Sequence, residues 1–313
     1  MFEDVLQAIR EFDTVILHRH NRPDGDALGS QIGLKHLILD NFPEKTVYAV
    51  GDDARFFSFM ADSVMDNVAD SAYEGALAII LDSASRPLIS DERYSLAAKT
   101  VRIDHHIFCE HIADIEVVDT SFESCCGMIA EFARESGLKI GPIAGQSLYT
   151  GMVTDSGRFR YDGTTARTFR LAALLLESGF DTNEVFRNLY ADEYANKELK
   201  AKFTLKIQFT PSKVAYIYTD REEFKALGKD TFTISRAMVN TMADIKGVDI
   251  WVNFTEADNG VLCELRSSRY NINPIAVKYG GGGHMKASGA TVPDRETAMA
   301  MLRDLDALTG ENV

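Results

Sequence analysis

Five short apolar runs in the first 120 residues constrain the fold of this chain more than any other feature. They are rich in aliphatic and β-branched residues, as buried strands are, and segments with apolar residues at helical spacing lie before, between and after them. This pattern predicts an α/β domain with a mainly parallel sheet and helices on both faces. The expected strands are residues 15–17, 45–50, 76–81, 100–103 and 115–118, and the expected helices are residues 2–11, 27–39, 126–136, 142–153 and 166–178.

The pattern changes between residues 191 and 209, where a charged helical segment, 193–206, has no strand to pair with. We interpret 191–209 as a helical connector between a larger domain, 1–190, and a smaller α/β domain, 210–313. A chain of 313 residues is long enough for two such domains. In the smaller domain we expect strands at 214–218, 248–255 and 261–266 and helices at 232–243 and 297–308.

The formal net charge of −14 excludes one class of function, because proteins that track long nucleic acids present a broad basic surface. Any nucleotide substrate should be short and held by local positive groups or metal ions. The apolar run 76–81 is too short to span a membrane, and the first residues lack the regions of a signal peptide, so we expect a cytoplasmic protein without a membrane partner. The four cysteines lack C-x-x-C spacing, and we expect them to serve as small buried residues.

The first apolar run breaks off into a loop that contains His20, Asp24 and Asp26. In an open α/β sheet, such a loop lies outside the carboxyl ends of the strands, where ligands bind. One interpretation is that the two aspartates only cap the following helix. The other is that all three side chains are metal ligands, which requires partners at other strand ends.

Partners of this kind follow the later runs. Asp82 follows the third run, Asp104-His105-His106 follow the fourth, and Asp155 ends a helical segment. Imidazoles and carboxylates without thiolates suit Mn²⁺, Mg²⁺, Fe²⁺ or Co²⁺ better than a structural zinc ion. Several aspartates at one sheet edge repel one another unless cations neutralise them. Two divalent ions would do so, and a pair of ions can clamp a phosphoryl group.

His105 and His106 are neighbours at the end of an extended strand. Adjacent residues of a strand point to opposite sides, so we expect the two rings to diverge and to have different roles.

The smaller domain contains four consecutive glycines, 280–283, directly before His284. Glycines let backbone N–H groups approach an anion closely, and an adjacent histidine adds a donor. A flexible hinge is the alternative interpretation. Arg266 and Ser268 stand at a strand end as further candidates for contacting a phosphate or a base, although a surface arginine without a role is the competing reading. Arg158 and Arg160, just after Asp155, remain unassigned.

Taken in order, these motifs resemble the motif set of the DHH phosphoesterases. They are HNRPDGDALGS at 20–30, Asp82, Asp104-His105-His106, TDSG at 154–157 and GGGGH at 280–284. The resemblance spans nearly the whole chain and includes the DHH-associated carboxy-terminal domain. It is strongest to the small two-domain members that hydrolyse short oligoribonucleotides and also act as phosphatases on 3′-phosphoadenosine 5′-phosphate (pAp).

The resemblance implies which residues bind the metal ions and which act on the substrate. His20 and Asp24 would bind one metal ion, Asp26 and His105 the other, and Asp82 and Asp155 would link or share the pair. His106 would face the substrate phosphate as a donor or general acid, with Asp104 orienting the histidines. Two divalent cations are implied, with Mn²⁺ as the expected ion and Mg²⁺, Co²⁺ and Fe²⁺ as alternatives. The expected catalytic set is therefore His106, Asp104 and Asp82.

The same resemblance implies a substrate that bridges the two domains across a cleft. Short single-stranded RNA or nucleotide phosphates are the expected partners, and a homodimer is one alternative for the oligomeric state. The expected substrate contacts are Gly281, Gly282, Gly283, His284, Arg266 and Ser268.

Competing functions stay open at this point. Relatives with the same metal motifs act as pyrophosphatases or exopolyphosphatases, but they carry a different, basic second domain. Relatives that cleave linear or cyclic dinucleotides such as pApA or c-di-AMP share both domains, and their common versions add membrane or sensor modules. A non-catalytic nucleotide-binding module is the alternative outside the enzymes, and retention of all six expected metal ligands speaks against it.

Overall fold

A computed structural model describes residues 1–310 and shows two compact units. The first unit runs from Met1 to Ala191 and the second begins at Asp192. Within the described residues, no helix is both long enough and apolar enough to cross a membrane.

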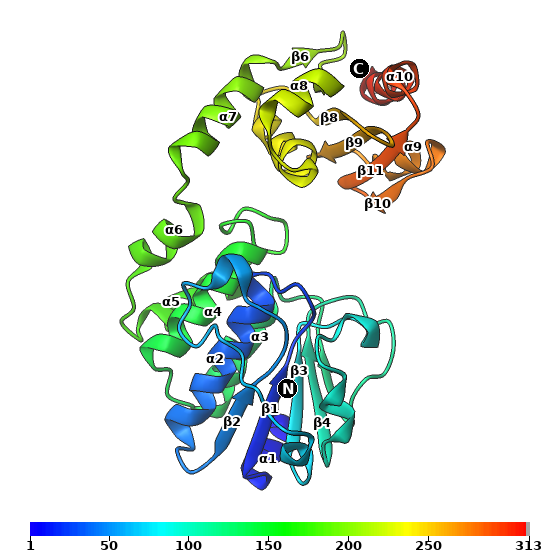
Figure 1. The fold of residues 1–313 in the computed structure, drawn as a ribbon. Coiled ribbons are helices and arrows are strands. Elements are labelled where there is room, and N and C mark those ends of the chain that lie inside the picture. Colours follow the sequence, from blue (N-terminus) through cyan, green and yellow to red (C-terminus); the bar gives the residue numbers. More distant parts are fainter. Residues whose placement is uncertain (311–313) are drawn as a thin grey trace. The chain divides into compact units, whose positions relative to one another are not determined.

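The first unit is built on a five-stranded, all-parallel sheet with the order β2-β1-β3-β4-β5. This confirms the α/β class expected from the sequence, and Figure 1 shows β1, β2, β3 and β4 side by side in the lower part of the view. The strands are β1 (Thr14–His18), β2 (Thr46–Ala49), β3 (Leu77–Leu81), β4 (Lys99–Asp104) and β5 (Ile115–Val118).

Helices cover both faces of this sheet, but the two faces differ in kind. Val15 and Leu17 point to the face covered by α-helices, whereas Ile16 and His18 point to the face covered by short 3₁₀ helices and loops. The α-helical layer contains α1 (Glu3–Glu11), α2 (Gly25–Asn41), α3 (Cys125–Ser136) and α4 (Pro142–Asp155), with α5 (Ala166–Leu176) and α6 (Thr182–Tyr190) packed on α4. The short helices are η1 (Arg55–Phe57), η2 (Asp70–Tyr73), η3 (Arg86–Leu88) and η4 (Glu92–Leu96).

Helices α2 and α4 pack against each other through glycines spaced four residues apart on α2. A Cβ atom at Gly25 would lie 2.4 Å from Oγ1 of Thr154, and one at Gly29 would lie 2.6 Å from the Ser147 carbonyl oxygen. Only glycine lets two helix backbones approach this closely. The contact brings the first turn of α2, which carries Asp26, next to the last turn of α4, which ends at Asp155.

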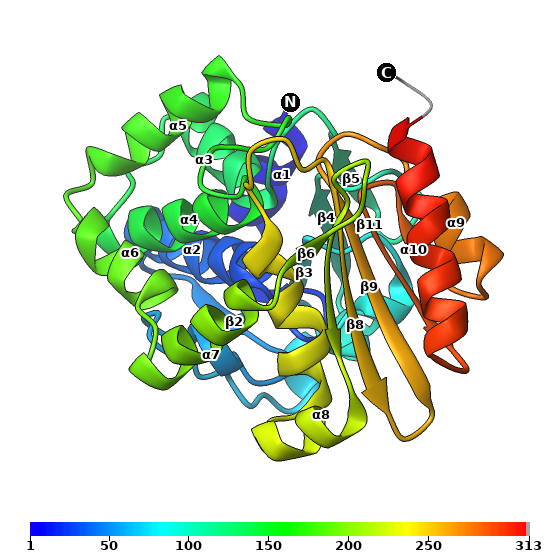
Figure 2. The ribbon, with the colours of Figure 1, turned by 90° about the horizontal axis from the view of Figure 1, so that it is seen from above.

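The second unit contains a six-stranded mixed sheet with the order β10-β11-β9-β8-β7-β6, in which β7 and β8 are parallel and the other pairs antiparallel. Helices α9 and α10 cover one face, and α7, η5 and η6 pack on the other (Figure 2). The elements are α7 (Tyr194–Leu205), β6 (Gln208–Phe209), β7 (Ala215–Thr219), α8 (Arg221–Leu227), η5 (Phe232–Ala237), η6 (Met238–Met242), β8 (Ile250–Ala257), β9 (Gly260–Ser267), α9 (Asn273–Lys278), β10 (Gly282–His284), β11 (Ala287–Val292) and α10 (Arg295–Gly310).

One expected helix takes a different form. Residues 232–243 form a π-helix followed by a 3₁₀ helix rather than an α-helix. Buried Asn253 donates its side-chain N–H groups to the carbonyl oxygens of Ile234 and Ser235, both at 2.7 Å, so these two carbonyls are engaged outside the helix. The charged helix expected as a connector, α7, buries Leu199 and Phe203 in the core of the second unit.

Candidate metal centre

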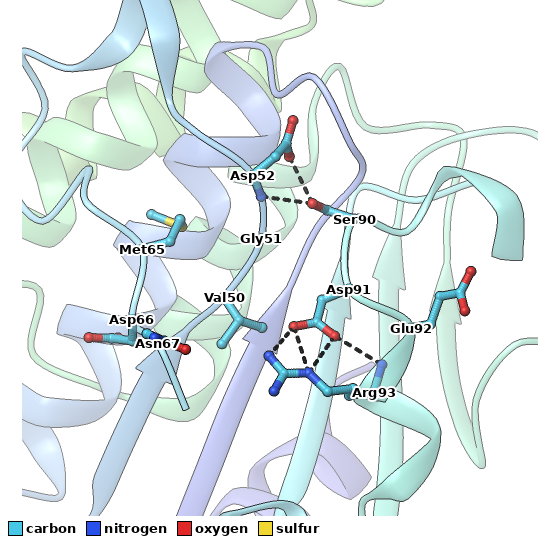
Figure 3. A pocket seen from close by; sticks show the side chains of 10 residues that line it. All are labelled: Val50, Gly51, Asp52, Met65, Asp66, Asn67, Ser90, Asp91, Glu92 and Arg93. Carbon is cyan, nitrogen blue, oxygen red and sulfur yellow. Dashed lines mark hydrogen bonds and ion pairs between the residues drawn. The ribbon is translucent and has the colours of Figure 1, made fainter. Parts of the chain in front are cut away.

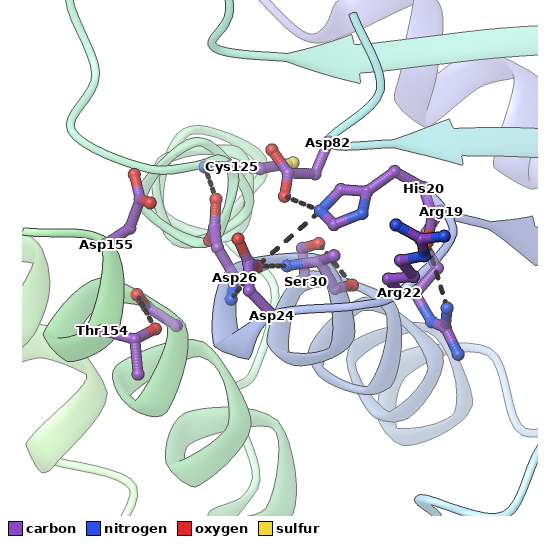
Figure 4. Close-up of polar contacts among 12 residues, drawn as sticks. Arg19, His20, Arg22, Asp24, Asp26, Ser30, Asp82, Cys125, Thr154 and Asp155 are labelled. Atoms are coloured by element: carbon purple, nitrogen blue, oxygen red, sulfur yellow. Dashed lines mark hydrogen bonds and ion pairs between the residues drawn. The ribbon is translucent and has the colours of Figure 1, made fainter. Parts of the chain in front are cut away.

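The candidate ligands gather at the carboxyl ends of neighbouring strands. His20 follows β1 and Asp82 follows β3. From β1 the chain first adds β2 on one side and then continues with β3 on the other side, so the strand order reverses between β1 and β3. Open parallel sheets bind ligands at such a switch point. Figure 4 shows five of the side chains converging there, namely His20, Asp24, Asp26, Asp82 and Asp155.

The six residues predicted as metal ligands fall into two clusters whose ligand atoms lie close together, and a third such group combines Asp82 and His105 with His106. The first cluster contains His20, Asp24 and Asp82. Nε2 of His20 lies 3.8 Å from Oδ1 of Asp24 and 3.4 Å from Oδ2 of Asp82. Nδ1 of His20 donates to the carbonyl oxygen of Asn21 at 2.7 Å, which directs Nε2 toward the carboxylates.

Asp24 is also the N-cap of α2, because its Oδ1 accepts the N–H groups of Asp26 and Ala27, both at 3.0 Å. Asp24 therefore does cap the helix, and it also lies near His20. The capping interpretation is wrong for Asp26, whose carboxylate points away from its own helix and accepts N–H groups from α3.

The second cluster contains Asp26, His105 and Asp155. Nε2 of His105 lies 3.7 Å from Oδ2 of Asp26 and 3.6 Å from Oδ2 of Asp155. Asp26 is almost completely buried, and its two oxygens accept the backbone N–H groups of Cys125 at 2.7 Å and Cys126 at 2.8 Å. The amino terminus of α3 thus holds one carboxylate of the cluster in place.

Asp82 joins the two clusters. Its Oδ2 faces His20, and its Oδ1 lies 3.5 Å from Nε2 of His105. The residue has a φ of 50°, a left-handed backbone that aspartate adopts at a cost of order 1–3 kcal/mol and that is concentrated at functional sites. Oδ1 is buried without a hydrogen-bond partner among the described residues. An orphaned carboxylate oxygen between two imidazoles fits a ligand that two cations share.

The charges of the clusters are poorly balanced without a cation. Burial, followed by the charges of Asp82 and Asp155, raises the pKa of Asp26 well above its usual range. Burial also raises the pKa of Asp155, to about 6, although His105 opposes the shift. Burial lowers the pKa of His105, but its contact with Asp82 and the charge of Asp26 outweigh this effect and raise the value to about 10. Protons therefore occupy positions that a divalent cation would take, and metal binding would release them.

Opposing effects act on the first cluster in the same way. Burial lowers the pKa of His20, but contacts with Asp24 and Asp82 raise it to about 11. Burial raises the pKa of Asp82, whereas its contacts with His105 and His20 bring it well below the usual range. Both clusters thus pair imidazolium with carboxylate when no metal ion is bound.

The rings of His105 and His106 do not diverge as the sequence suggests. Their centroids lie 4.6 Å apart, and Nδ1 of His106 lies 3.5 Å from Oδ1 of Asp82. The reason is that β4 ends at Asp104, so the two histidines lie beyond the alternating geometry of the strand. Nδ1 of His106 contacts Oδ1 of Asp104 at 2.8 Å, and the Asp104 contact raises the pKa of the His106 ring.

Two of the predicted substrate contacts project from the same face of the sheet in the second unit. Arg266 on β9 and His284 on β10 are both direct cross-strand neighbours of Ala287 on β11. Residues opposite each other on adjacent strands share a face, so the two side chains stand in one row, two strand spacings apart. Ser268 lies beyond the end of β9, where its hydroxyl contacts Asp249.

The glycine run forms a tight hairpin and not a hinge. A Cβ atom at Gly281 would lie 2.0 Å from the carbonyl oxygen of Gly289, and Gly283 pairs with Ser288 at a φ of 130°. These two glycines are therefore required by the hairpin itself. Gly282 has open space on the side where a side chain would stand, and it is the position where close approach of a ligand accounts best for glycine.

A pocket of about 660 Å³ lies apart from the ligand clusters, between the loops that follow β2 and the segment before η4 (Figure 3). Its lining is acidic, and three of its aspartates have cationic partners within the protein. Asp66 contacts Lys35, Asp52 contacts Arg19, and Asp91 forms a two-pronged pair with Arg93.

Sequence reasoning missed several residues that support the clusters. The N–H groups of Cys125 and Cys126 that donate to Asp26 belong to the backbone, and a pattern of side chains cannot predict such donors. Buried Arg19 stands beside His20, and an arginine at a strand end carries no signal of burial. Three of the cysteines are buried as expected, whereas Cys109 is exposed because it lies in the irregular segment after β4.

Comparisons with known proteins find family models and relatives that match this chain. Residues 14–152 match the DHH family, N-terminal domain, and residues 225–311 match the DHHA1 domain. A relative from Streptococcus mutans, described as "Probable bifunctional oligoribonuclease and PAP phosphatase NrnA", is 39% identical over 92% of this chain and 93% of its own. A relative from Bacillus subtilis, described as "Bifunctional oligoribonuclease and PAP phosphatase NrnA", is 35% identical over the full length of both chains.

A solved structure shares the fold. The crystal structure of an exopolyphosphatase-related protein from Bacteroides fragilis superposes with a TM-score of 0.83 and covers 98% of this chain and 95% of its own. At 23% sequence identity, this likeness concerns the fold and not the activity.

Proposed function

This chain belongs to the DHH family and carries a DHHA1 domain, and on that premise we propose that it hydrolyses short oligoribonucleotides to mononucleotides and dephosphorylates pAp. It is a hydrolase that acts on phosphoester bonds. Two relatives that match 92% and 100% of this chain are both described as bifunctional oligoribonuclease and PAP phosphatase. The net charge of −14 suits short substrates better than a long nucleic-acid track.

The observation that carries the proposal is the pair of ligand clusters that meet at Asp82. His20, Asp24 and Asp82 would hold one divalent cation, and Asp26, His105 and Asp155, again with Asp82, would hold the other. When bound, such a pair supplies positive charge to a phosphoester and acidifies the attacking water. Oxygen and imidazole ligands are compatible with Mn²⁺, and we propose Mn²⁺ as the resident ion.

His106 has a role distinct from that of the ligands. Its Nδ1–H donates to Oδ1 of Asp104, which fixes the ring, and its side chain is 45% exposed. Nε2 is therefore free to carry a proton toward the substrate. We assign His106 as the donor to a phosphate oxygen or to the leaving group, with Asp104 as the residue that orients it.

In the second unit, Arg266 and His284 stand in one row beside the open position at Gly282. An arginine and a histidine next to an accessible backbone are suited to a phosphate group, which would compete with Glu264 for Arg266, 3.3 Å away. We propose that this row binds a phosphate of the nucleotide substrate. Ser268 is a weaker candidate, because its hydroxyl is already engaged by Asp249.

A substrate panel with Mn²⁺ tests the proposal. Wild-type protein should release mononucleotides from RNA of two to five nucleotides and inorganic phosphate from pAp, with little turnover of pyrophosphate. Preferential cleavage of pApA or c-di-AMP would favour a dinucleotide phosphodiesterase. Preferential cleavage of pyrophosphate, or nucleotide binding without turnover, would contradict the proposal.

A further inference from the structure

The side chain of Arg19, directly before His20, is completely buried and donates four hydrogen bonds, and Figure 4 shows it beside His20. Its Nε donates to Oε1 of Gln31 at 2.9 Å, and its Nη1 donates to Oδ1 of Asp52 at 2.9 Å and to the carbonyl oxygen of His20 at 3.1 Å. Nη2 donates to the carbonyl oxygen of Asp52. The guanidinium thus ties the loop after β1 to the loop after β2.

Asp52 completes this connection from the other side. Its Oδ2 accepts the backbone N–H of Arg22 at 2.8 Å, at a residue whose φ is 52°. Its Oδ1 accepts the hydroxyl of Ser90 at 2.8 Å, and the Ser90 hydroxyl oxygen in turn accepts the N–H of Asp52 (Figure 3). These hydrogen bonds hold the segment from Arg19 to Arg22, which contains His20, in place.

The support of His20 is therefore separate from the supports of the neighbouring carboxylates. The segment that contains His20 is held by Arg19 and Asp52, whereas Asp24 is held by N–H groups at the start of α2 and Asp26 by those at the start of α3. No contact described for Arg19 or Asp52 reaches Asp26, His105 or Asp155 among the described residues.

We propose that the Arg19–Asp52 pair is a positioning device for one metal position only, the one formed by His20, Asp24 and Asp82. The inference rests on the proposed two-metal function and adds that the two positions can be weakened independently. Removing the Asp52 carboxylate frees the Arg22 N–H and loosens the loop, so the first position loses affinity and the second keeps it. Outer groups that orient metal ligands change affinity by about 10- to 100-fold when they are removed.

The test compares Mn²⁺ binding to full-length wild type, Asp52→Ala and Asp66→Ala. Asp66 is a matched control, because it lines the same pocket, accepts a backbone N–H from Ala49 and contacts Lys35, without touching the His20 loop. Isothermal titration calorimetry gives the number and affinity of the sites. Electron paramagnetic resonance distinguishes isolated Mn²⁺ from a spin-coupled pair. Ser90→Ala is a milder variant that stays informative if Asp52→Ala folds poorly.

Wild type and Asp66→Ala should bind two ions and show the coupled signal. Asp52→Ala should keep one site unchanged, weaken the other about 10- to 100-fold, and show the isolated Mn²⁺ signal at one equivalent. Asp52→Asn, which keeps an acceptor oxygen for the Arg22 N–H, should recover part of the lost affinity. Equal weakening of both sites, no change, or the same loss in Asp66→Ala would overturn the positioning role while leaving the proposed function intact. A wild type that binds fewer than two ions would overturn both.

Discussion

Oδ1 of Asp104 lies 2.8 Å from Nδ1 of His106 and holds that ring beside the Asp82 carboxylate. Asp104 also contacts the buried Arg102 at 2.6 Å, so the carboxylate is itself fixed. The arrangement presents an imidazole that is 45% exposed next to the ligand clusters.

Asp104→Asn should lower kcat on a dinucleotide by about 10- to 100-fold without changing Mn²⁺ content, because it removes the group that orients His106. The Asp104 carboxylate raises the pKa of His106, so the variant ring should lose its proton at lower pH. If His106 donates a proton, the alkaline decline of kcat moves to lower pH in the variant. An unchanged pH profile would contradict the donor role, and circular dichroism checks that the variant is folded.

His284→Ala should raise KM for nucleotide substrates while Mn²⁺ affinity stays unchanged, because His284 lies in the second unit in a row with Arg266. Loss of a charge-assisted hydrogen bond of about 1.5–3 kcal/mol corresponds to roughly 10- to 100-fold. Met285→Ala, at an exposed neighbour, is the control. Equal loss of metal and substrate binding would argue against a separate phosphate contact.

Gly151→Ala should weaken both the fold and the second ligand cluster. A Cβ atom at this position would lie 2.2 Å from Sγ of Cys126 and 3.0 Å from Cα of Asp26, so α4 must shift away from α2 and α3. Overpacking of this kind costs about 1–3 kcal/mol, which urea denaturation can measure. Gly163→Ala, whose Cβ would meet only ordinary contacts at 3.6 Å, should have little effect. A Gly151 variant with wild-type stability would show that the helices are not tightly coupled.

His18 should make the protein less stable in acid, independently of the ligand clusters. Its ring is completely buried between Tyr73 and Tyr94, and burial lowers its pKa to about 4, although Asp91 opposes the shift. The unfolded chain takes up this proton near pH 6.5, so the stability is fully present above that value and is lost as the pH falls toward 4. The loss amounts to about 3 kcal/mol.

His18→Gln has no titrating group at position 18, so its free energy of unfolding should fall less between pH 7 and 4 than that of wild type. His111→Gln, at a side chain that is 85% exposed, should not change this fall. Urea denaturation between pH 4 and 7 measures both variants. A His18→Gln profile that falls as steeply as that of wild type would assign the acid sensitivity to other groups.

Much of the site could be predicted from the sequence because parallel strands end at the same edge of a sheet. Asp82 and His105, far apart in the chain, are neighbours for that reason alone. Supports made by backbone groups, such as the Cys126 N–H on Asp26, depend on how α3 meets α2 and leave no trace in residue type. The spacing of Gly25, Gly29 and Gly33 by four residues was the available signal for close packing of α2 against α4.

The fold of the second unit was less predictable in its details. Asn253, buried in the sheet, engages the carbonyls of Ile234 and Ser235, and a local apolar period cannot reveal a partner on a strand twenty residues away. Helix α8 spans only seven residues, too short for a clear period. The row formed by Arg266 and His284 depends on the register of three strands, which emerges only from the assembled sheet.

The central claim is that two cations meeting at Asp82 cleave short oligoribonucleotides, and one measurement tests it most directly. Mononucleotide release from an RNA dinucleotide is followed with and without Mn²⁺ for wild type and Asp82→Asn, which keeps the shape of the side chain and removes its charge. The account predicts Mn²⁺-dependent release by wild type and release at background level by Asp82→Asn. Wild-type rates in Asp82→Asn, or release by wild type that persists after metal removal, would contradict it.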